Sequence, residues 1–195
     1  MGTRIEERFV VRAPPGAVWS YLVDPRRVVG CLPGAELTEV VDERTFHGNV
    51  RVKVGPVSVS YKGRVQLSEL DEAGGRVRMV GEGRESGGAG SAKMTMESRL
   101  RALPEGATEV TVVADVDVVG RLVQLGRGMI EQVSHQLFLQ FSECVRATLE
   151  AEAAGAAGGG APARQEAVRA IPLLLRALWA WLAGLVRRLL GGPGR

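Results

Sequence analysis

Cysteine and histidine are scarce in this chain of 195 residues, which contains two of each. Cys31 and Cys144 stand far apart without Cys-x-x-Cys spacing, so each is expected to be a buried free thiol in a cytoplasmic protein. His47 and His135 have no cysteine or carboxylate at metal-ligand spacing, so no metal site is expected. The motifs of zinc proteases, serine hydrolases and phosphate-binding loops are also missing. We therefore assign no catalytic residues and do not expect an enzyme.

Residues 1–163 lack the basic face with interleaved aromatic side chains that is typical of nucleic-acid binding. Residues 164–195 hold six arginines and one glutamate, a net charge of +5, whereas the whole chain carries +3. The first 163 residues are therefore near −2, and nucleic acid is not an expected partner. The positive charge belongs to the tail, where it favours contact with anionic lipid.

The tail has the pattern of a separate amphipathic helix. Leucines share one face, arginines lie opposite, and a tryptophan stands at each border, as a membrane–water interface favours. An ordinary helix packed on the protein's own core or on a partner remains an alternative, as does a transmembrane anchor. The apolar run between Arg176 and Arg187 is ten residues long, against about 20 for a span. The residues expected to bind the membrane surface are Arg169, Leu174, Arg176, Leu178, Trp179, Trp181, Leu182, Leu185, Arg187, Arg188 and Leu189.

Composition divides the chain into three parts. Residues 1–152 have the length of one domain with its own core. Residues 153–163 form a Gly/Ala-rich linker that is expected to be flexible, and residues 164–195 form the basic tail. This organisation predicts a cytoplasmic protein that associates peripherally with the inner face of the cytoplasmic membrane.

Apolar and polar residues alternate with a period of two between residues 46 and 118. One apolar face and one polar face are typical of an antiparallel sheet that is covered on one side. Gly81-Glu82-Gly83 and Gly87-Gly88-Ala89-Gly90 open no helix, so they are interpreted as a strand bend and a hairpin. Asp115 and Asp117 are expected to face solvent.

A long helical pattern over residues 121–150 supplies the cover for this sheet. Leu122, Leu125, Met129, Val133, Leu137 and Phe141 recur at intervals of three and four residues. A helix of this length spans about 45 Å. The predicted architecture is α+β: a curved antiparallel sheet of about six or seven strands that grips a long C-terminal helix, with a separate amphipathic tail helix.

A set of short motifs, in the order in which they occur along the chain, narrows the choice of protein family. They are Ala13-Pro14-Pro15, Val18-Trp19, Asp24-Pro25, Cys31-Leu32-Pro33-Gly34, Lys53-Val54-Gly55-Pro56-Val57, Lys62-Gly63-Arg64-Val65, Gly81-Glu82-Gly83, Gly88-Ala89-Gly90-Ser91-Ala92 and residues 119–126. As an ordered set over residues 3–149 they resemble the G-subunit family of carbon monoxide dehydrogenase, within the SRPBCC superfamily, also called START-like or helix-grip. The chain departs from the family at Val119-Gly120-Arg121, where Gly-Gly-Lys is common.

The resemblance implies a cavity between the sheet and the long helix that holds a lipophilic small molecule. It also implies an accessory role that links a molybdenum CO dehydrogenase-type oxidoreductase to the membrane. No covalently bound cofactor is expected, and a quinone or another lipid is the expected non-covalent ligand. The residues expected to line the cavity are Trp19, Leu22, Leu32, Val52, Tyr61, Val65, Met94, Met96, Val112, Val116, Leu122, Leu125, Met129, Val133, Leu137 and Phe141.

Three functions remain open on the sequence alone. A carrier would hold the quinone in the cavity while the tail holds the domain at the membrane. A recruitment or assembly module would dock the oxidoreductase at the membrane without a ligand. A small-molecule enzyme such as a cyclase would need polar residues on the apolar face, where Tyr61 is nearly the only candidate.

Overall fold

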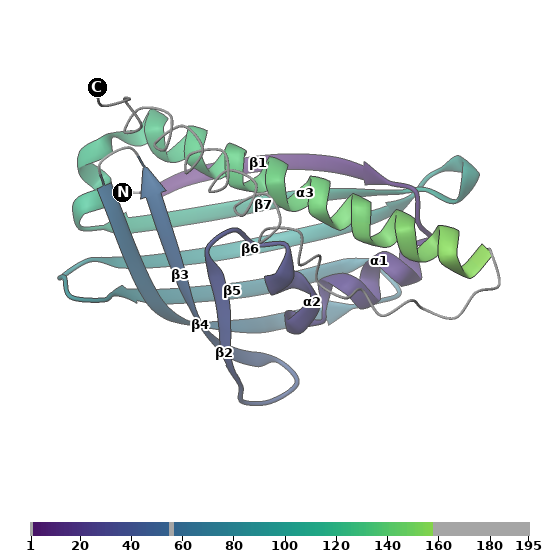
Figure 1. Ribbon diagram of the computed structural model, residues 1–195, viewed down its shortest axis with the longest axis horizontal. Coiled ribbons are helices and arrows are strands. Elements are labelled where there is room, and N and C mark those ends of the chain that lie inside the picture. Colours follow the sequence, from purple (N-terminus) through teal and green to yellow (C-terminus); the bar gives the residue numbers. More distant parts are fainter. Residues whose placement is uncertain (1, 55–56, 158–195) are drawn as a thin grey trace, which may run out of the picture. The chain divides into compact units, whose positions relative to one another are not determined.

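The computed structural model describes residues 2–54 and 57–157. Over these residues the chain forms an α+β fold in which the strands come first and the longest helix comes last (Figure 1). The elements are β1 (Gly2–Val11), α1 (Pro15–Leu22), α2 (Pro25–Gly30), β2 (Ala35–Val40), β3 (Thr45–Val54), β4 (Val57–Asp71), β5 (Arg76–Glu85), β6 (Ser91–Ala102), η1 (Pro104–Gly106), β7 (Thr108–Val119), η2 (Arg121–Leu125) and α3 (Arg127–Ala157). The tail and the end of the linker lie outside the described residues.

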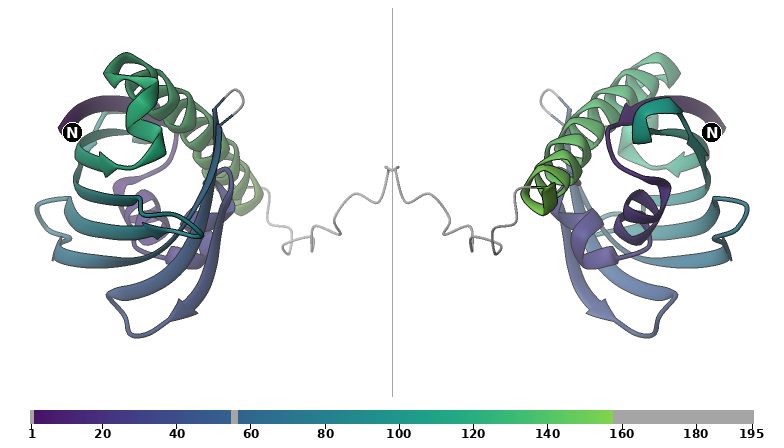
Figure 2. Two further views of the ribbon diagram at one scale, coloured as in Figure 1. Left: turned by 90° about the vertical axis from the view of Figure 1, so that its left-hand side faces the viewer. Right: turned by 90° about the vertical axis from the view of Figure 1, so that its right-hand side faces the viewer.

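Within the described residues the strands form one seven-stranded sheet in the order β1-β7-β6-β5-β4-β3-β2. All neighbouring strands are antiparallel. β1 is one edge strand of the sheet and pairs with β7, from Gly2 opposite Asp117 to Val11 opposite Thr108. Figures 1 and 2 show that β2 and β3 run steeply across the direction of β5, β6 and β7, so the sheet curves around α3. The predicted helix-grip fold is confirmed.

Glycines at one level of the sheet permit this curvature. Gly48, Gly63 and Gly83 are opposite one another on β3, β4 and β5. A Cβ atom on Gly48 would lie 2.7 Å from the carbonyl oxygen of Glu36, and one on Gly63 would lie 2.6 Å from that of Glu82. Only glycine allows the backbones to approach this closely.

The two short helices close one end of the concave side. Pro15 starts α1, and the Asp24 side chain caps α2 by accepting a hydrogen bond from the Arg26 amide at 2.9 Å. A first core cluster joins these helices to β1, β7 and the second half of α3 through Phe9, Val11, Ala13, Val18, Tyr21, Cys31, Val110, Val145 and Leu149. A second cluster consists of Trp19, Phe46, Leu67 and Val77.

The long helix begins later than the periodicity predicts. Residues 121–125 form the 3-10 turn η2, and α3 starts at Arg127. Gly126 lies between them with φ +81, a conformation that interrupts an α-helix. At its other end α3 continues to Ala157, five residues into the stretch that composition assigns to the linker. Its buried stripe follows Phe138, Phe141, Val145 and Leu149.

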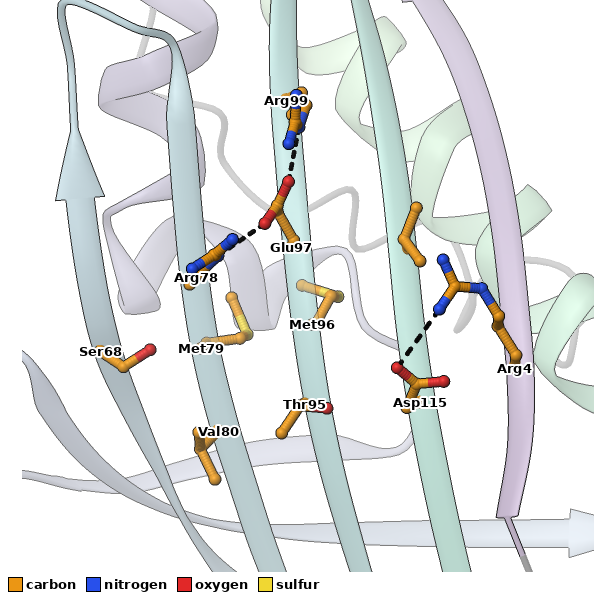
Figure 3. Close-up of a pocket in the computed structure, with 11 residues that line it drawn as sticks. Arg4, Ser68, Arg78, Met79, Val80, Thr95, Met96, Glu97, Arg99 and Asp115 are labelled. Carbon is orange, nitrogen blue, oxygen red and sulfur yellow. Dashed lines mark hydrogen bonds and ion pairs between the residues drawn. The ribbon is translucent and has the colours of Figure 1, made fainter.

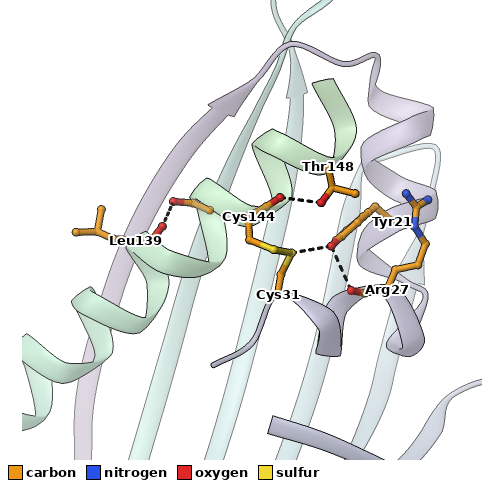
Figure 4. The surroundings of a disulfide bond; sticks show 7 residues. Tyr21, Arg27, Cys31, Leu139, Cys144 and Thr148 are labelled. Carbon is orange, nitrogen blue, oxygen red and sulfur yellow. Dashed lines mark hydrogen bonds between the residues drawn. A yellow bond between two sulfur atoms is a disulfide. The ribbon is translucent and has the colours of Figure 1, made fainter. Parts of the chain in front are cut away.

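The expectation of two free thiols is wrong. Cys31 and Cys144 form a disulfide with their Cα atoms 5.5 Å apart (Figure 4). The bond joins the C-terminal end of α2 to α3 across 113 residues of sequence. Spacing along the chain could not indicate the pair, because the fold alone brings the two side chains together.

Candidate ligand-binding surface

The concave face of the sheet is largely apolar but is not packed to the same degree along its length. Near α1 and α2, the side chains of Val11, Val18 and Val110 are fully buried. Further from these helices Val59, Ala114 and Val118 are also buried, but a group of inward-facing apolar side chains around them is only half-buried. We call this region the inner surface, and it comprises Val52, Val65, Met79, Met94, Met96 and Val116 on the sheet and Ile130, Val133 and Leu137 on α3.

Strand register explains why these residues share a face. Met96 is opposite Met79 on β5 and Ala114 on β7, and Met94 is opposite Gly81 and Val116. Side chains at opposed positions of neighbouring strands point the same way. The alternation in the sequence is therefore enough to place Met94, Met96 and Val116 together on the inner face.

The predicted lining residues differ in their surroundings. Val52, Val65, Met94, Met96, Val116, Val133 and Leu137 belong to the inner surface, and Leu122 is half-buried on η2. Trp19 lies in the second core cluster, while Leu22, Val112 and Phe141 pack against the first. Leu32 and Met129 are both 40% exposed. Tyr61 is buried on the inner side of β4, and the side chain of Leu125 lies outside the described residues.

A polar cluster interrupts the apolar inner face beside Tyr61. Glu85, opposite Tyr61 in the register, has a side chain that is only 1% exposed. Its Oε1 atom accepts a hydrogen bond from Arg121 Nε at 2.9 Å, and a terminal nitrogen of the same guanidinium contacts this oxygen as well. The buried carboxylate is thus neutralised by an arginine whose own side chain is 58% exposed.

Glycines make room for this carboxylate. A Cβ atom on Gly90 would collide with Glu85 Oε2, and one on Gly88 would lie 2.7 Å from Glu85 Cδ. Gly120 has φ +109, and a Cβ there would lie 2.7 Å from the Cα of Gly90. The glycine-rich β5–β6 hairpin predicted from sequence is confirmed, and its glycines surround a buried acid.

Glu85 and Arg121 were not among the residues predicted from the sequence. A usable signal was present for Glu85, because it continues the inward parity of Val77, Met79 and Gly83 along β5. A charged residue at an inward position requires a partner. The sequence offered no way to select Arg121 as that partner, since it lies 36 residues away on η2.

Burial changes the acidity of both tyrosines. The pKa of Tyr61 is raised, first by desolvation and then by the negative charge of Glu85, while Arg121 opposes the shift. The pKa of Tyr21 is also raised, mainly by desolvation. The neutral hydroxyl is therefore the favoured form of each side chain.

The two histidines each contact one carboxylate. His47 Nδ1 lies 2.9 Å from Glu39 Oε2, and His135 Nδ1 lies 2.6 Å from Glu7 Oε1. Within residues 2–54 and 57–157, no group of three or more His, Cys, Asp or Glu side chains is arranged to hold a metal ion.

A depression on the opposite, outer face of the sheet has a different character (Figure 3). Charged side chains line it and pair with one another: Glu97 binds Arg78 and Arg99, and Arg4 lies 3.7 Å from Asp115. The two arginines lower the pKa of the Glu97 carboxyl through their hydrogen bonds. The lining also includes Met79, Val80, Met96 and Val113. We do not identify this depression with the predicted cavity, because the charged side chains that line it lie on the outer face of the sheet and not between the sheet and α3.

In the part of the chain that the structure describes, no helix combines the length and the apolarity that crossing a bilayer requires. The membrane-surface residues predicted from Arg169 to Leu189 lie outside that part.

Comparison with known proteins supports the fold and the resemblance noted in the sequence. The family model for the G subunit of carbon monoxide dehydrogenase (CoxG) matches residues 8–150. No curated protein matches the chain.

Similar solved structures show the same fold at low sequence identity. A conserved protein from Geobacillus kaustophilus is 17% identical, with a TM-score of 0.69 over 76% of this chain and 96% of its own. The ZhuI aromatase/cyclase from Streptomyces sp. R1128 is 19% identical, with a TM-score of 0.60 over 83% and 100%. A START superfamily protein from Mycobacterium smegmatis is 12% identical, with a TM-score of 0.53 over 76% and 97%.

Proposed function

Since the chain belongs to the CoxG family, named for the G subunit of carbon monoxide dehydrogenase, we propose that it is an accessory protein that binds a quinone on its inner surface and links a molybdenum CO dehydrogenase-type oxidoreductase to the membrane. Electrons from a soluble dehydrogenase must reach a quinone that stays in the bilayer. A domain that shelters the quinone on an apolar surface would let the two meet.

The half-buried inner surface is the observation that carries the proposal. Met94, Met96 and Val116 point toward the helix side of the sheet and remain partly exposed to solvent. Val11 and Val110, on the same face, are fully buried. Burying apolar surface stabilises the protein by about 25 cal/mol for each Å², and the exposed part of these side chains lacks that stabilisation. A lipophilic ligand would recover that free energy, and methionine side chains adapt readily to a flexible chain.

The proposed membrane contact rests on the sequence of the tail. Its leucine face, arginine face and bordering tryptophans favour a helix that lies in the plane of the interface. We place the protein at the inner face of the cytoplasmic membrane, peripherally bound. The Cys31–Cys144 bond bears on this placement because disulfides are rare in cytosolic proteins. Trapping thiols in intact cells before lysis will show whether the disulfide forms at that location.

The test begins with the full chain purified from a quinone-producing host. Organic extraction followed by mass spectrometry should recover a quinone in a stoichiometric amount. Absence of any lipid in the extract, together with no binding when quinone is added, would overturn the proposal.

Neighbouring residues on β6 provide a matched pair of variants. Met96 faces the inner surface, whereas Thr95 is exposed on the outer face. Met96→Asn should reduce the quinone recovered, and Thr95→Asn should not. Circular dichroism and thermal unfolding of both variants will separate a loss of binding from a loss of fold.

The alternative is a ligand-free recruitment or assembly module for the same oxidoreductase. Deleting residues 164–195 discriminates between the two proposals. A carrier without its tail would still bind quinone in solution but would leave the membrane. A recruiter would also leave the membrane, and it would bind no quinone with or without the tail.

A further inference from the structure

The hydroxyl of Tyr61 is buried and has no hydrogen-bond partner among the described residues. The residue as a whole is 4% exposed. The chain has one other tyrosine, and its hydroxyl is satisfied: Tyr21 Oη donates to the carbonyl oxygen of Arg27 at 3.1 Å. Thr3 Oγ1 and Arg76 Nε are the other buried side-chain atoms without a partner among the described residues. Leaving a buried hydroxyl unpaired destabilises the folded protein, so its retention at Tyr61 needs a physical reason.

Tyr61 lies on the same inward face of β4 as Val65 of the inner surface. Tyr61 lies on β4 two register positions from Gly63, and its side chain passes close to Gly83 on β5. A Cβ atom on Gly83 would lie 3.4 Å from Tyr61 Cβ and 3.8 Å from Cδ1. Gly83 and the Tyr61 side chain are therefore direct neighbours on the concave side of the sheet.

The charges around Tyr61 determine what kind of group it can bind. Glu85 is opposite Tyr61 and is already hydrogen-bonded to Arg121. Because Glu85 and Arg121 neutralise each other, the site offers no net charge to compensate a buried carboxylate or a buried ammonium group, and burying either would be costly. A neutral acceptor meets neither penalty, and burial keeps the hydroxyl protonated so that it can donate.

We propose that the Tyr61 hydroxyl donates a hydrogen bond to a neutral carbonyl oxygen at one end of a lipophilic ligand, whose apolar part lies along Val65, Met94 and Met96. This inference rests on the proposed ligand-binding function and adds the recognition of a carbonyl head to it.

The experiment compares Tyr61→Phe with Tyr21→Phe, which removes the one satisfied tyrosine hydroxyl. Two probes of matched length are titrated calorimetrically into the full chain: decylubiquinone, which has carbonyl groups, and decylbenzene, which has none. Tyr61→Phe should weaken decylubiquinone binding about 2- to 10-fold, the net worth of one neutral hydrogen bond, and leave decylbenzene binding unchanged. Tyr21→Phe should leave both affinities unchanged.

Two further readouts separate recognition from a structural role. The midpoint of thermal unfolding of the ligand-free protein should stay equal or rise in Tyr61→Phe, because an unpaired hydroxyl is removed, and should fall in Tyr21→Phe. The infrared carbonyl band of bound decylubiquinone should shift to lower frequency in the wild-type protein and lose that shift in Tyr61→Phe.

The failures are distinguishable. Wild-type protein that binds neither probe would overturn the proposed function and this inference together. Wild-type protein that binds both probes, with Tyr61→Phe binding decylubiquinone equally tightly or unfolding earlier when ligand-free, would overturn this inference alone.

Discussion

Cys31 and Cys144 are bonded across 113 residues, and the hydroxyl of Tyr21 lies 3.0 Å from the Cys31 sulfur (Figure 4). The disulfide therefore links the residue that follows α2 covalently to α3. This linkage lies at the end of the fold that holds the first core cluster. The inner surface lies beyond this fastened end. A rigid packed end and a less packed end are what a binding domain needs, because only the second must admit a ligand.

Removing the disulfide should lower the stability of the packed end. The double variant Cys31→Ala with Cys144→Ala is expected to lose about 2–4 kcal/mol in free energy of unfolding, because a long loop is no longer closed in the unfolded chain. Urea unfolding followed by circular dichroism measures the loss. Wild-type protein treated with reductant is the control and should shift by a similar amount. An unchanged midpoint on reduction would contradict the prediction.

Truncating the partner of the buried acid should also destabilise the domain. Arg121→Ala leaves the Glu85 carboxylate buried without its hydrogen bonds, at an expected cost of about 2 kcal/mol. Adding Glu85→Gln to this variant should recover part of the loss, because the buried group is then neutral. Arg4→Ala removes an exposed ion pair to Asp115 and should change stability by less than about 1 kcal/mol. Equal effects of Arg121→Ala and Arg4→Ala would show that Glu85 does not need its partner.

The glycine between β7 and η2 should not tolerate a side chain. Gly120→Ala combines φ +109 with a Cβ 2.7 Å from the backbone of Gly90, so a loss of about 1–3 kcal/mol is expected. Gly155 lies in α3, and within residues 2–54 and 57–157 no atom lies within 4 Å of a Cβ built on it. Gly155→Ala should therefore raise stability by up to about 1 kcal/mol. Chemical unfolding of the two variants checks the opposite signs, and a neutral Gly120→Ala would disprove the close approach.

Stability should fall at alkaline pH because of the two buried tyrosines. Their pKa values are raised in the folded state, so above about pH 10 the unfolded chain binds fewer protons than the folded one. The free energy of unfolding should thus be independent of these groups below about pH 10 and decrease as the pH rises further. Tyrosinate absorbance at 295 nm reports only Tyr21 and Tyr61, since the chain has no other tyrosine. Titration of the folded protein below about pH 10 would contradict the prediction.

The tail should bind vesicles through both charge and apolar contact. Binding of the full chain is expected to rise with the fraction of anionic lipid and to fall with salt. Trp179→Ala with Trp181→Ala should weaken binding, because it removes the side chains that favour the interface. A chain without residues 164–195 is the control and should remain in solution. Unchanged partitioning of the tryptophan variant would favour a protein partner, and equal binding to neutral vesicles at high salt would refute the electrostatic contribution.

Much of the fold could be predicted because the relevant signals are local. The alternation of Val110, Val112, Ala114, Val116 and Val118 with polar residues predicts a one-sided strand, and the strand is present with that face inward. The stripe along α3 likewise follows from spacing. The helix start was predicted six residues too early because apolar periodicity continues through η2, and only the backbone conformation of Gly126 shows the interruption.

The inner surface could be predicted only in part. Met94, Met96 and Val116 share its face by parity, whereas Trp19 and Phe141 have equally apolar side chains but pack in or against the cores. Sequence cannot separate the two groups, because burial depends on which elements from elsewhere in the chain cover a residue.

The order and type of neighbouring residues account for the alternating strands, the long amphipathic helix, the family resemblance and the separation of a basic tail from a near-neutral domain. Three other features emerge only in the folded chain: Cys31 meets Cys144, Glu85 is buried against Arg121, and the Tyr61 hydroxyl has no partner among the residues that the structure describes. These features depend on residues tens of positions apart along the chain. Such contacts form only after the sheet has curved around α3 and brought its ends together, so no local pattern can encode them.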